Sequence, residues 1–208
     1  MTEALVSGLL AGYGVAVPVG AIAVLILGLS ARTSLTVGAG AGLGAATADG
    51  IYAAVAVVGG TAVAGLLRPV ATPLRWLAAA VLVGLAARTA AVAWRHHLDR
   101  DRPARPDRGL STPGRAYLGL LALTLLNPAT VIYFSALVLG RQAGGAPSVA
   151  ASVVFVLAAF AASASWQLLV AASGSAVGRI LTGARGRLVT AVASSALIVL
   201  LAIALVAR

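Results

Sequence analysis

The feature that most constrains this sequence is a series of apolar stretches, each about as long as a bilayer is thick. A hydrocarbon core about 30 Å thick needs roughly 20 apolar residues in a helix, and several windows meet this length. The predicted helices are Leu5–Leu29, Leu35–Ala64, Leu74–Trp94, Tyr117–Leu139, Val149–Ala172 and Leu188–Val206. Because the bilayer core offers backbone groups no water, such runs have to be helical. The sequence therefore predicts an all-α integral membrane protein with six transmembrane helices.

The composition supports this fold class and excludes several functions. Hydrophobic residues make up 61% of the 208 residues and charged residues only 10%, whereas soluble domains average about 45–50% and about 25%. The chain has no cysteine, which excludes disulfides, thiol nucleophiles and thiolate metal sites. Its formal net charge of +10 does not indicate a nucleic-acid partner, because the arginines lie mostly in short breaks between apolar runs and form no continuous basic face.

The distribution of arginine predicts the orientation in the membrane, because arginine is retained on the cytoplasmic side. The connections after the first, third and fifth predicted helices contain Arg32, Arg95, Arg100, Arg102, Arg105, Arg108, Arg115, Arg179, Arg185 and Arg187. The opposite side contains Arg68, Arg75, Arg141 and Arg208. We therefore expect both termini to lie outside.

One long polar connection divides the chain into two halves of three predicted helices. Residues 95–115 contain three prolines and mixed charges without apolar periodicity, which is typical of a solvated loop. The single membrane domain, residues 1–208, then consists of one repeat at about 1–94 and a second at about 116–208. The loop's adjacent His96 and His97 have no carboxylate at ligand spacing, so we expect them to be exposed and not metal-bound.

Two prolines lie in the middle of predicted helices, at corresponding places in the two halves. Pro18 lies about thirteen residues into the first helix and Pro128 about eleven into the fourth. Each removes a backbone hydrogen bond and frees a carbonyl, which has to be satisfied again or to line a cavity. Interrupted helices in matching places indicate a transporter binding site. The sequence predicts two inverted three-helix repeats with helices 1 and 4 interrupted; two simple packing kinks are the alternative.

The residues beside these prolines suit a binding site. Gly20 follows Pro18 and lets another helix or a substrate approach the backbone. Asn127 precedes Pro128 and offers an amide donor and acceptor inside the bilayer. We therefore include all four residues in the predicted substrate site.

Asp49 is the only acidic residue within a predicted helix. A charged aspartate near the middle of a membrane helix costs about 2.5–3.5 kcal/mol on insertion scales, so we expect it to face the interior, to pair with another group or to take up a proton. It could exchange protons or serve as the counter-charge of an ammonium group. Thr47 and Tyr52 could hydrogen-bond to it or to a ligand, and Arg88 could form an ion pair with it. A fixed pair of Asp49 with Arg88 that only stabilises the fold is the alternative.

The fifth predicted helix has one polar cluster, formed by Ser163, Ser165, Trp166 and Gln167. The repeat predicts that it lies opposite the region of Thr47 and Asp49 and lines the site. The alternative is that the serines bond to their own helix and that Trp166 lies at the membrane interface.

Small residues four apart mark one face of the second predicted helix. Gly40 and Gly44 belong to the run from Gly38 to Gly44, and such spacing lets helix backbones approach closely. This face predicts helix packing, either against the first predicted helix or in a homodimer.

Two segments of the chain resemble the LysE/RhtB family of amino-acid exporters. They are GYGVAVPVGAIAVLILGLSARTSLTVGAGAGLGAATADGIYAAVAVVGG and LLNPATVIYF, and the likeness covers essentially the whole chain. The family signature is a Pro-Gly-Pro in the first helix, an aspartate in a glycine-rich second helix and an Asn-Pro in the fourth. Pro18, Asp49, Asn127 and Pro128 match this signature, whereas the first motif reads Pro-Val-Gly here.

This resemblance implies export of amino acids or related small zwitterions across the bacterial cytoplasmic (inner) membrane. The proton gradient or the membrane potential would drive it, as in an antiporter, with a small-molecule substrate, the lipid bilayer as environment and no cofactor. The residues agree with this mechanism, with Asp49 as the protonatable or ammonium-binding group. Half-helix N-termini near Pro18 and Pro128 would meet a substrate carboxylate.

Other functions fit the sequence less well. An intramembrane enzyme would need two aspartates, several clustered acids or an HExxH pair, and the predicted helices contain one acid and no histidine. A divalent metal-ion exporter would need several ligands, and the helices offer little beyond Asp49, Asn127 and hydroxyl groups. A membrane scaffold without transport is a third alternative, and it predicts that Asp49→Asn has no effect.

Overall fold

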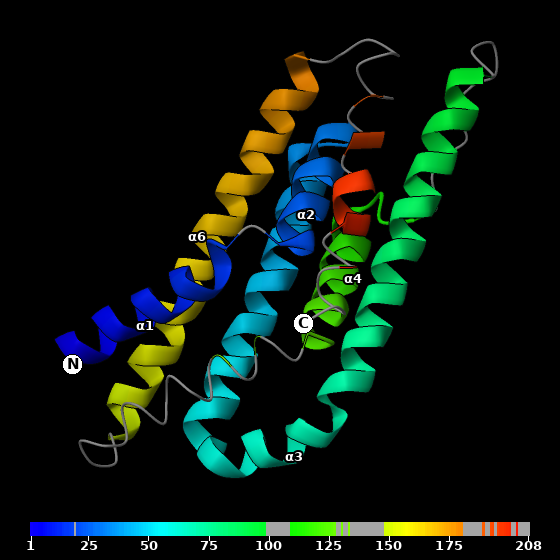
Figure 1. Ribbon diagram of the computed structural model, residues 1–208. Coiled ribbons are helices and arrows are strands. Elements are labelled where there is room, and N and C mark those ends of the chain that lie inside the picture. Colours follow the sequence, from blue (N-terminus) through cyan, green and yellow to red (C-terminus); the bar gives the residue numbers. More distant parts are fainter. Residues whose placement is uncertain are drawn as a thin grey trace.

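The computed structural model describes residues 1–18, 20–98, 109–127 and 148–180, with residues 130, 133, 189, 192, 193, 195–200 and 203. In parts of α3, among them residues 59–72, only the backbone is described. All regular structure in this part of the chain is helical (Figure 1), which confirms the predicted class. The helices are α1 (Thr2–Ala16), α2 (Ala21–Arg32), α3 (Leu35–Leu98), α4 (Pro113–Leu125) and α6 (Val149–Ile180).

Two described stretches are long and apolar enough to cross a membrane, Leu35–Val58 and Val149–Gly178. The bent pair of α1 and α2 makes a third if it counts as one span. About half of the sixth predicted helix and most of the second part of the fourth lie outside the described residues. The number of six helices therefore stays a prediction.

α1 and α2 are two parts of one bent element. α1 ends at Ala16 and α2 begins at Ala21, with an angle of 75° between them. Pro18 lies in this break, where its missing N–H group favours an end of the helical hydrogen-bond series. Gly20 is the N-cap of α2 in an extended conformation, with φ of −116° and ψ of −177°.

α3 differs from the sequence prediction of two helices, Leu35–Ala64 and Leu74–Trp94. The backbone is helical from Leu35 to Leu98 without a break, although Figure 1 shows that the helix turns back on itself. Pro69 and Pro73 lie between the two predicted helices. A proline can kink a helix without ending it, because only one hydrogen bond is lost and the helical dihedral angles are kept.

α4 begins earlier than the predicted Tyr117 because the local sequence caps it. The side chain of Thr112 accepts a hydrogen bond from the N–H of Arg115 at 3.4 Å, and Pro113 occupies the first turn. Proline is favoured there because its missing N–H would have no helical partner anyway. α4 ends at Leu125, just before Asn127.

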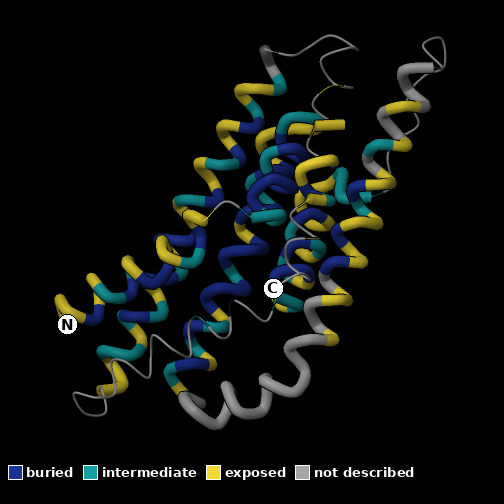
Figure 2. Tube along the Cα trace, viewed as in Figure 1, coloured by how far each residue is buried: buried dark blue, intermediate teal, exposed yellow. Residues whose placement is uncertain are grey.

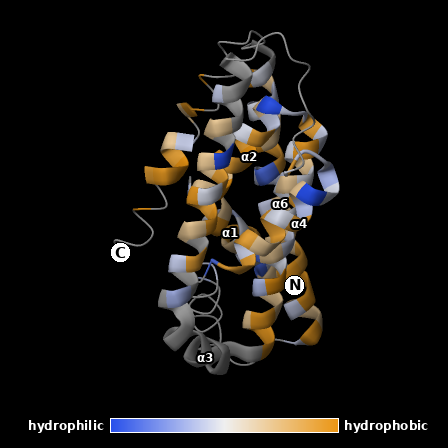
Figure 3. Cartoon of the chain, turned by 90° about the vertical axis from the view of Figure 1, so that its right-hand side faces the viewer, coloured by the Kyte–Doolittle hydropathy of each residue, from blue (hydrophilic) through white to orange (hydrophobic). Residues whose placement is uncertain are grey.

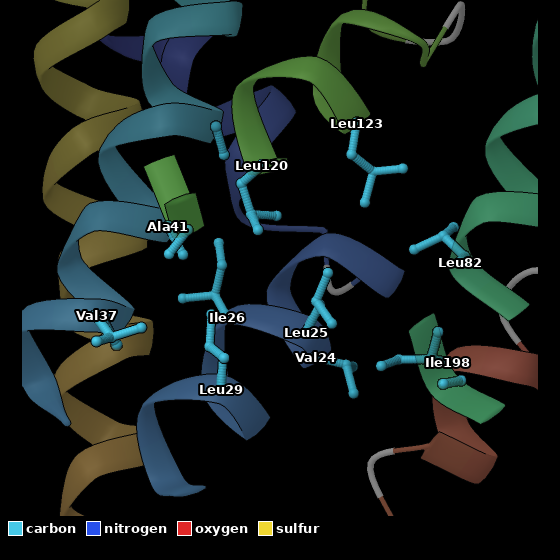
Figure 4. Close-up of a cluster of buried hydrophobic side chains, with 14 of the residues drawn as sticks. Val24, Leu25, Ile26, Leu29, Val37, Ala41, Leu82, Leu120, Leu123 and Ile198 are labelled. Atoms are coloured by element: carbon cyan, nitrogen blue, oxygen red, sulfur yellow. The ribbon is translucent and has the colours of Figure 1, made fainter. Parts of the chain in front are cut away.

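The largest core cluster surrounds α2. Val24, Leu25, Ile26 and Leu29 project from α2 toward neighbouring helices (Figure 4). Their partners include Val37, Ala41, Leu82, Leu120, Leu123 and Ile198. Both arms of α3, α4 and the last described segment therefore pack around α2, and buried residues gather where these helices meet (Figure 2).

The polarity of α6 is the reverse of that of a helix in a soluble protein. Its outer face exposes Val153, Leu157 and Leu169, whereas its inner face buries Ser163 and Gln167. Apolar residues dominate the described helices in Figure 3. Polar groups inside and large apolar groups outside are typical of a helix surrounded by lipid.

Glycines bring α1 and α6 into backbone contact. A Cβ atom added to Gly8 would collide with the backbone of Phe155, and one added to Gly12 would collide with the backbone of Ala159. Gly174 and Gly178 of α6 meet the backbone of α2 in the same way. These two small-residue pairs were not among the predicted packing residues.

Gly40 and Gly44 contact α4 of the same chain, where the sequence predicted the first helix or a second copy of the chain. A Cβ atom on Gly40 would collide with the backbone of Pro113, and one on Gly44 with the backbone of Tyr117. This face of α3 is therefore covered by α4, and contact with a second copy of the chain would need another face. The homodimer itself stays a prediction.

We predict opposite effects of alanine at two helical glycines. Gly12→Ala places a Cβ atom 2.8 Å from the Cβ atom of Ala162 and against the α6 backbone, and such overpacking costs about 1–3 kcal/mol. Gly84→Ala meets nothing within 4 Å, so it should stabilise by up to about 1 kcal/mol through helix propensity. Unfolding of both variants in mixed detergent micelles measures the difference. Equal stabilisation by both substitutions would contradict the α1–α6 contact.

Candidate functional site

Asp49 lies at the contact between the two halves of the chain. It is only 4% exposed on α3, and its partner Ser163 on α6 is fully buried. The Ser163 hydroxyl donates a hydrogen bond to Oδ2 of Asp49 at 2.6 Å. Hydrogen bonds to a charged acceptor are about twice as strong as neutral ones. The only predicted intramembrane acid is thus buried and directly bonded to the polar cluster of α6.

Two glycines of α3 allow α6 to come this close. A Cβ atom on Gly42 would lie 3.1 Å from the Cβ atom of Gln167, and one on Gly50 would lie 3.3 Å from the ring of Phe160. A Cβ atom at either position would have to displace its neighbour by a few tenths of an ångström. The glycines of α3 therefore allow the close approach at which Ser163 reaches Asp49.

Tyr52 connects Asp49 with the end of α4. It follows Asp49 by three residues on α3 and is close enough for an electrostatic interaction with it. Its hydroxyl donates a hydrogen bond to the carbonyl of Leu125, the last residue of α4. The last carbonyls of a helix have no helical partner, so Tyr52 satisfies a group that the helix end leaves open.

The position at which the sequence predicts a break in the fourth helix, Asn127–Pro128, comes directly after α4. The N–H of Asn127 donates to the carbonyl of Thr124 at 3.0 Å, and the Asn127 side chain is half-buried. Pro128 lies outside the described residues. The structure thus brings Asp49, Tyr52 and the α4 end before Asn127 into one region.

Thr47 faces α4 through a different contact. Its hydroxyl donates to the carbonyl of Leu43 at 2.8 Å and accepts a hydrogen bond from the Tyr117 hydroxyl at 3.2 Å. Thr47 therefore links α3 to α4, whereas Asp49 accepts its hydrogen bond from Ser163.

Two polar atoms beside Ser163 are buried with no hydrogen-bond partner among the described residues. They are Oε1 of Gln167 and Nε1 of Trp166. Gln167 is 5% exposed and follows Ser163 by one helical turn. Buried polar atoms are nearly always paired, so these two are candidates for contact with a ligand or water.

The remaining predicted residues lie further from this pair. The guanidinium group of Arg88 lies against Gly109, just before α4, and the Arg88 side chain is exposed. Pro18 is exposed in the break between α1 and α2, and Gly20 is half-buried there. No side chain caps the first N–H groups of α2, so they form an open positive helix end.

Sequence reasoning did not find the partner of Asp49 or the role of Tyr133. It assigned Ser163 to a polar cluster without pairing it, and it named Arg88 as the possible partner. It did not single out Tyr133, whose hydroxyl lies against Gly14 of α1. Sequence periodicity cannot give such contacts, because they depend on how two distant helices are aligned.

The described residues contain no group of three or more His, Cys, Asp or Glu side chains that could hold a metal ion. The side chains of His96 and His97 lie outside this description. The chemistry of the described region is therefore that of one buried carboxylate among hydroxyl and amide groups.

These observations define a class: a multi-pass helical membrane protein with an acid buried beside an interrupted helix. The family model described as LysE type translocator matches residues 14–208. The chain therefore belongs to this family of membrane transporters, as the sequence resemblance predicted. Comparisons with curated proteins and with solved structures give no significant match.

We predict that Ser163→Ala destabilises the protein by about 1.5–3 kcal/mol, the range for a lost hydrogen bond to a charged group. The carboxylate of Asp49 stays buried but loses its donor. Ser173→Ala is the matched control, because the Ser173 hydroxyl donates only to Leu169 of its own helix and should change stability by less than about 0.5 kcal/mol. Unfolding in mixed micelles measures both. Equal effects of the two substitutions would contradict the importance of the Asp49–Ser163 bond.

Proposed function

We propose that this chain is a secondary active exporter of amino acids or related small zwitterions across the bacterial cytoplasmic membrane, driven by the proton gradient or the membrane potential. The observation that carries this proposal is the buried hydrogen bond between Asp49 of α3 and Ser163 of α6. A carboxylate in such a place has a large desolvation cost, and a cation or a proton can offset it. The chain belongs to a translocator family, which supports transport as the reason why the buried carboxylate is retained despite its desolvation cost.

Asp49 would bind the substrate ammonium group or a proton. Ser163 supplies one hydrogen bond, and a carboxylate can accept several. An ammonium group provides three donors and a positive charge. Competition between proton and ammonium for the same oxygens would couple export to proton entry, because only one of them can neutralise the carboxylate at a time.

The N-terminus of α2 would bind the substrate carboxylate. Gly20 begins α2 without a side-chain cap, so the first N–H groups of the helix are available. A helix N-terminus carries a partial positive charge and favours anions. The break at Pro18 places this end within the span instead of at the membrane surface. The equivalent end after Pro128 is proposed from the repeat alone.

The buried amide of Gln167 and the indole N–H of Trp166 would line the same site. Both lie within one turn of Ser163, and each has a buried polar atom with no partner among the described residues. They would hydrogen-bond to the substrate or to water that accompanies it.

The register of the glycine contacts supports the inverted repeat. In the α1–α6 contact, Gly8 meets Phe155 and Gly12 meets Ala159, so the partners are 147 positions apart. The partner helices run in the same direction, because both residue numbers increase together.

The α3–α4 contact has the register that the repeat requires. Gly40 meets Pro113 and Gly44 meets Tyr117, so the partners are 73 positions apart. Pro18 and Pro128 differ by 110 positions. Adding 110 to the residue number of the α1 partner and subtracting 110 from that of the α6 partner gives two positions that are 73 apart instead of 147. One shift thus relates the two prolines and the two helix contacts.

The same shift indicates that the site is asymmetric. It relates Asp49 to Ala159 and Ser163 to Ala53, two alanines that are fully buried in one apolar cluster. The two halves would therefore share a backbone arrangement, whereas only one of two equivalent positions carries the acid and its donor. We propose one ammonium or proton site per chain.

The proposed orientation predicts opposite accessibility of two single cysteines in this cysteine-free chain. Glu3→Cys should react with a membrane-impermeant maleimide in intact cells, because the N-terminus is proposed to lie outside. Asp101→Cys should react only after the membrane is opened, because the arginine-rich connection is proposed to lie in the cytoplasm. The reverse pattern of labelling would contradict this orientation.

We predict that Asp49→Asn abolishes export of one class of amino acid. Cells loaded with dipeptides would release a panel of radiolabelled amino acids, and release is compared with that from cells carrying an empty vector. Asp101→Asn is the control, because it removes an acid from the polar connection. Loss of export in the Asp49 variant alone supports the proposal. Equal release from wild type, both variants and empty-vector cells across the panel would refute amino-acid export.

A further inference from the structure

All four tyrosines of the chain place their hydroxyl groups against the other half of the molecule. The contacts are Tyr13 with Ser165 at 2.9 Å, Tyr117 with Thr47 at 3.2 Å, Tyr52 with the Leu125 carbonyl, and Tyr133 with Gly14. Each pair joins a residue before the long polar connection to a residue after it. Two of these contacts lie between regular helical turns, and two lie at the interrupted helices.

Tyr133 lies at the residue whose carbonyl Pro18 leaves without a helical partner. In a regular helix the N–H of residue 18 would donate to the carbonyl of Gly14, but proline has no N–H. A Cβ atom on Gly14 would collide with the Tyr133 hydroxyl, so the absence of a side chain lets this hydroxyl reach the backbone. Gly14 and Tyr133 thus form a fitted pair at the first break.

Tyr52 has the corresponding position at the second break. Its hydroxyl donates to the carbonyl of Leu125 in the last turn of α4. Tyr52 belongs to the first half and α4 to the second, whereas Tyr133 belongs to the second half and Gly14 to the first. Each interrupted helix is therefore contacted by a tyrosine from the opposite half.

We propose that Tyr52 and Tyr133 are reciprocal positioning residues, each of which places its hydroxyl group against the backbone of the broken helix of the other half. This role rests on the proposed transport function, because the breaks flank the proposed substrate site. An unpaired carbonyl in a low-dielectric interior is costly, so each tyrosine fixes the local course of the break. The tyrosines also make the shape of each break depend on how the two halves pack.

The chain offers matched controls for this proposal. Tyr117→Phe removes a hydroxyl that joins the two halves away from the breaks, and Tyr13→Phe removes one that joins the last turn of α1 to Ser165 of α6 without contact to a backbone carbonyl at the break. Tyr52→Phe and Tyr133→Phe remove the same atom at the breaks. Similar melting temperatures for all four variants would show that any difference in behaviour is local.

The first readout needs no transport, because the chain has no cysteine. Single reporters are introduced by Leu126→Cys after α4 and by Val17→Cys after α1, and maleimide labelling is followed in liposomes. We expect Tyr52→Phe to raise labelling at position 126 severalfold and Tyr133→Phe to raise it at position 17. Tyr13→Phe and Tyr117→Phe should leave both rates unchanged. Unchanged labelling in both break variants would overturn the proposal.

Gly14→Ala tests the first break by a second route. Its methyl group displaces the Tyr133 hydroxyl, so labelling at position 17 should rise as it does in Tyr133→Phe. The two substitutions together should add little to either one alone, because they disrupt one contact. Additive effects would contradict a direct role of Tyr133 at Gly14.

The second readout separates this proposal from the proposed function. For a transported amino acid, the break variants should raise the Michaelis constant about tenfold, which corresponds to about 1.4 kcal/mol of lost binding. The controls should leave it unchanged, and an equal rise in all four variants would contradict the proposal. If the wild type transports no amino acid, the proposed function fails while the labelling rates still decide the role of the tyrosines.

Discussion

The buried carboxylate of Asp49 needs a hydrogen-bond donor and closely packed helices around it, and the surrounding structure provides both. A charge inside a membrane helix needs a partner, and Ser163 of α6 provides a hydrogen bond at 2.6 Å. That distance requires α3 and α6 to pack closely, which Gly42 and Gly50 allow. The outer face of α6 is apolar, as a lipid environment demands, and its inner face buries Ser163 and Gln167 among alanines and Phe155. The close contact of α3 with α6 therefore encloses the few buried polar groups around one carboxylate.

At the interrupted helices, backbone carbonyls that lose their helical N–H partner need another hydrogen-bond donor. Tyr52 satisfies the carbonyl of Leu125 at the end of α4, and the Tyr133 hydroxyl lies at Gly14. Because these side chains come from the opposite halves, tertiary contacts add to the local effect of Pro18. A change in the packing of the halves would thus alter the breaks and the region of Asp49 together.

Local sequence features predicted the helical class, the break at Pro18 and the end of α4 before Asn127, because apolar length and proline act within a few residues. The burial of Asp49 followed from the cost of an isolated charge. The pairing with Ser163 and the contacts of Gly8 and Gly12 with α6 could not be predicted, since they depend on the alignment of helices far apart in sequence. The unbroken course of α3 also escaped prediction, because apolar length separates Leu35–Ala64 from Leu74–Trp94 and does not show whether the backbone stays helical between them.

We propose that Asp49 recognises the ammonium group of a zwitterion. The most direct test is equilibrium binding of a transported amino acid to the purified protein, with competition by the 2-hydroxy acid that has the same side chain and carboxylate. We expect the wild type to bind the hydroxy acid far more weakly than the amino acid, and the Asp49→Asn protein to lose this preference. Equal binding of both compounds by the wild type, or an unchanged preference in the variant, would contradict it.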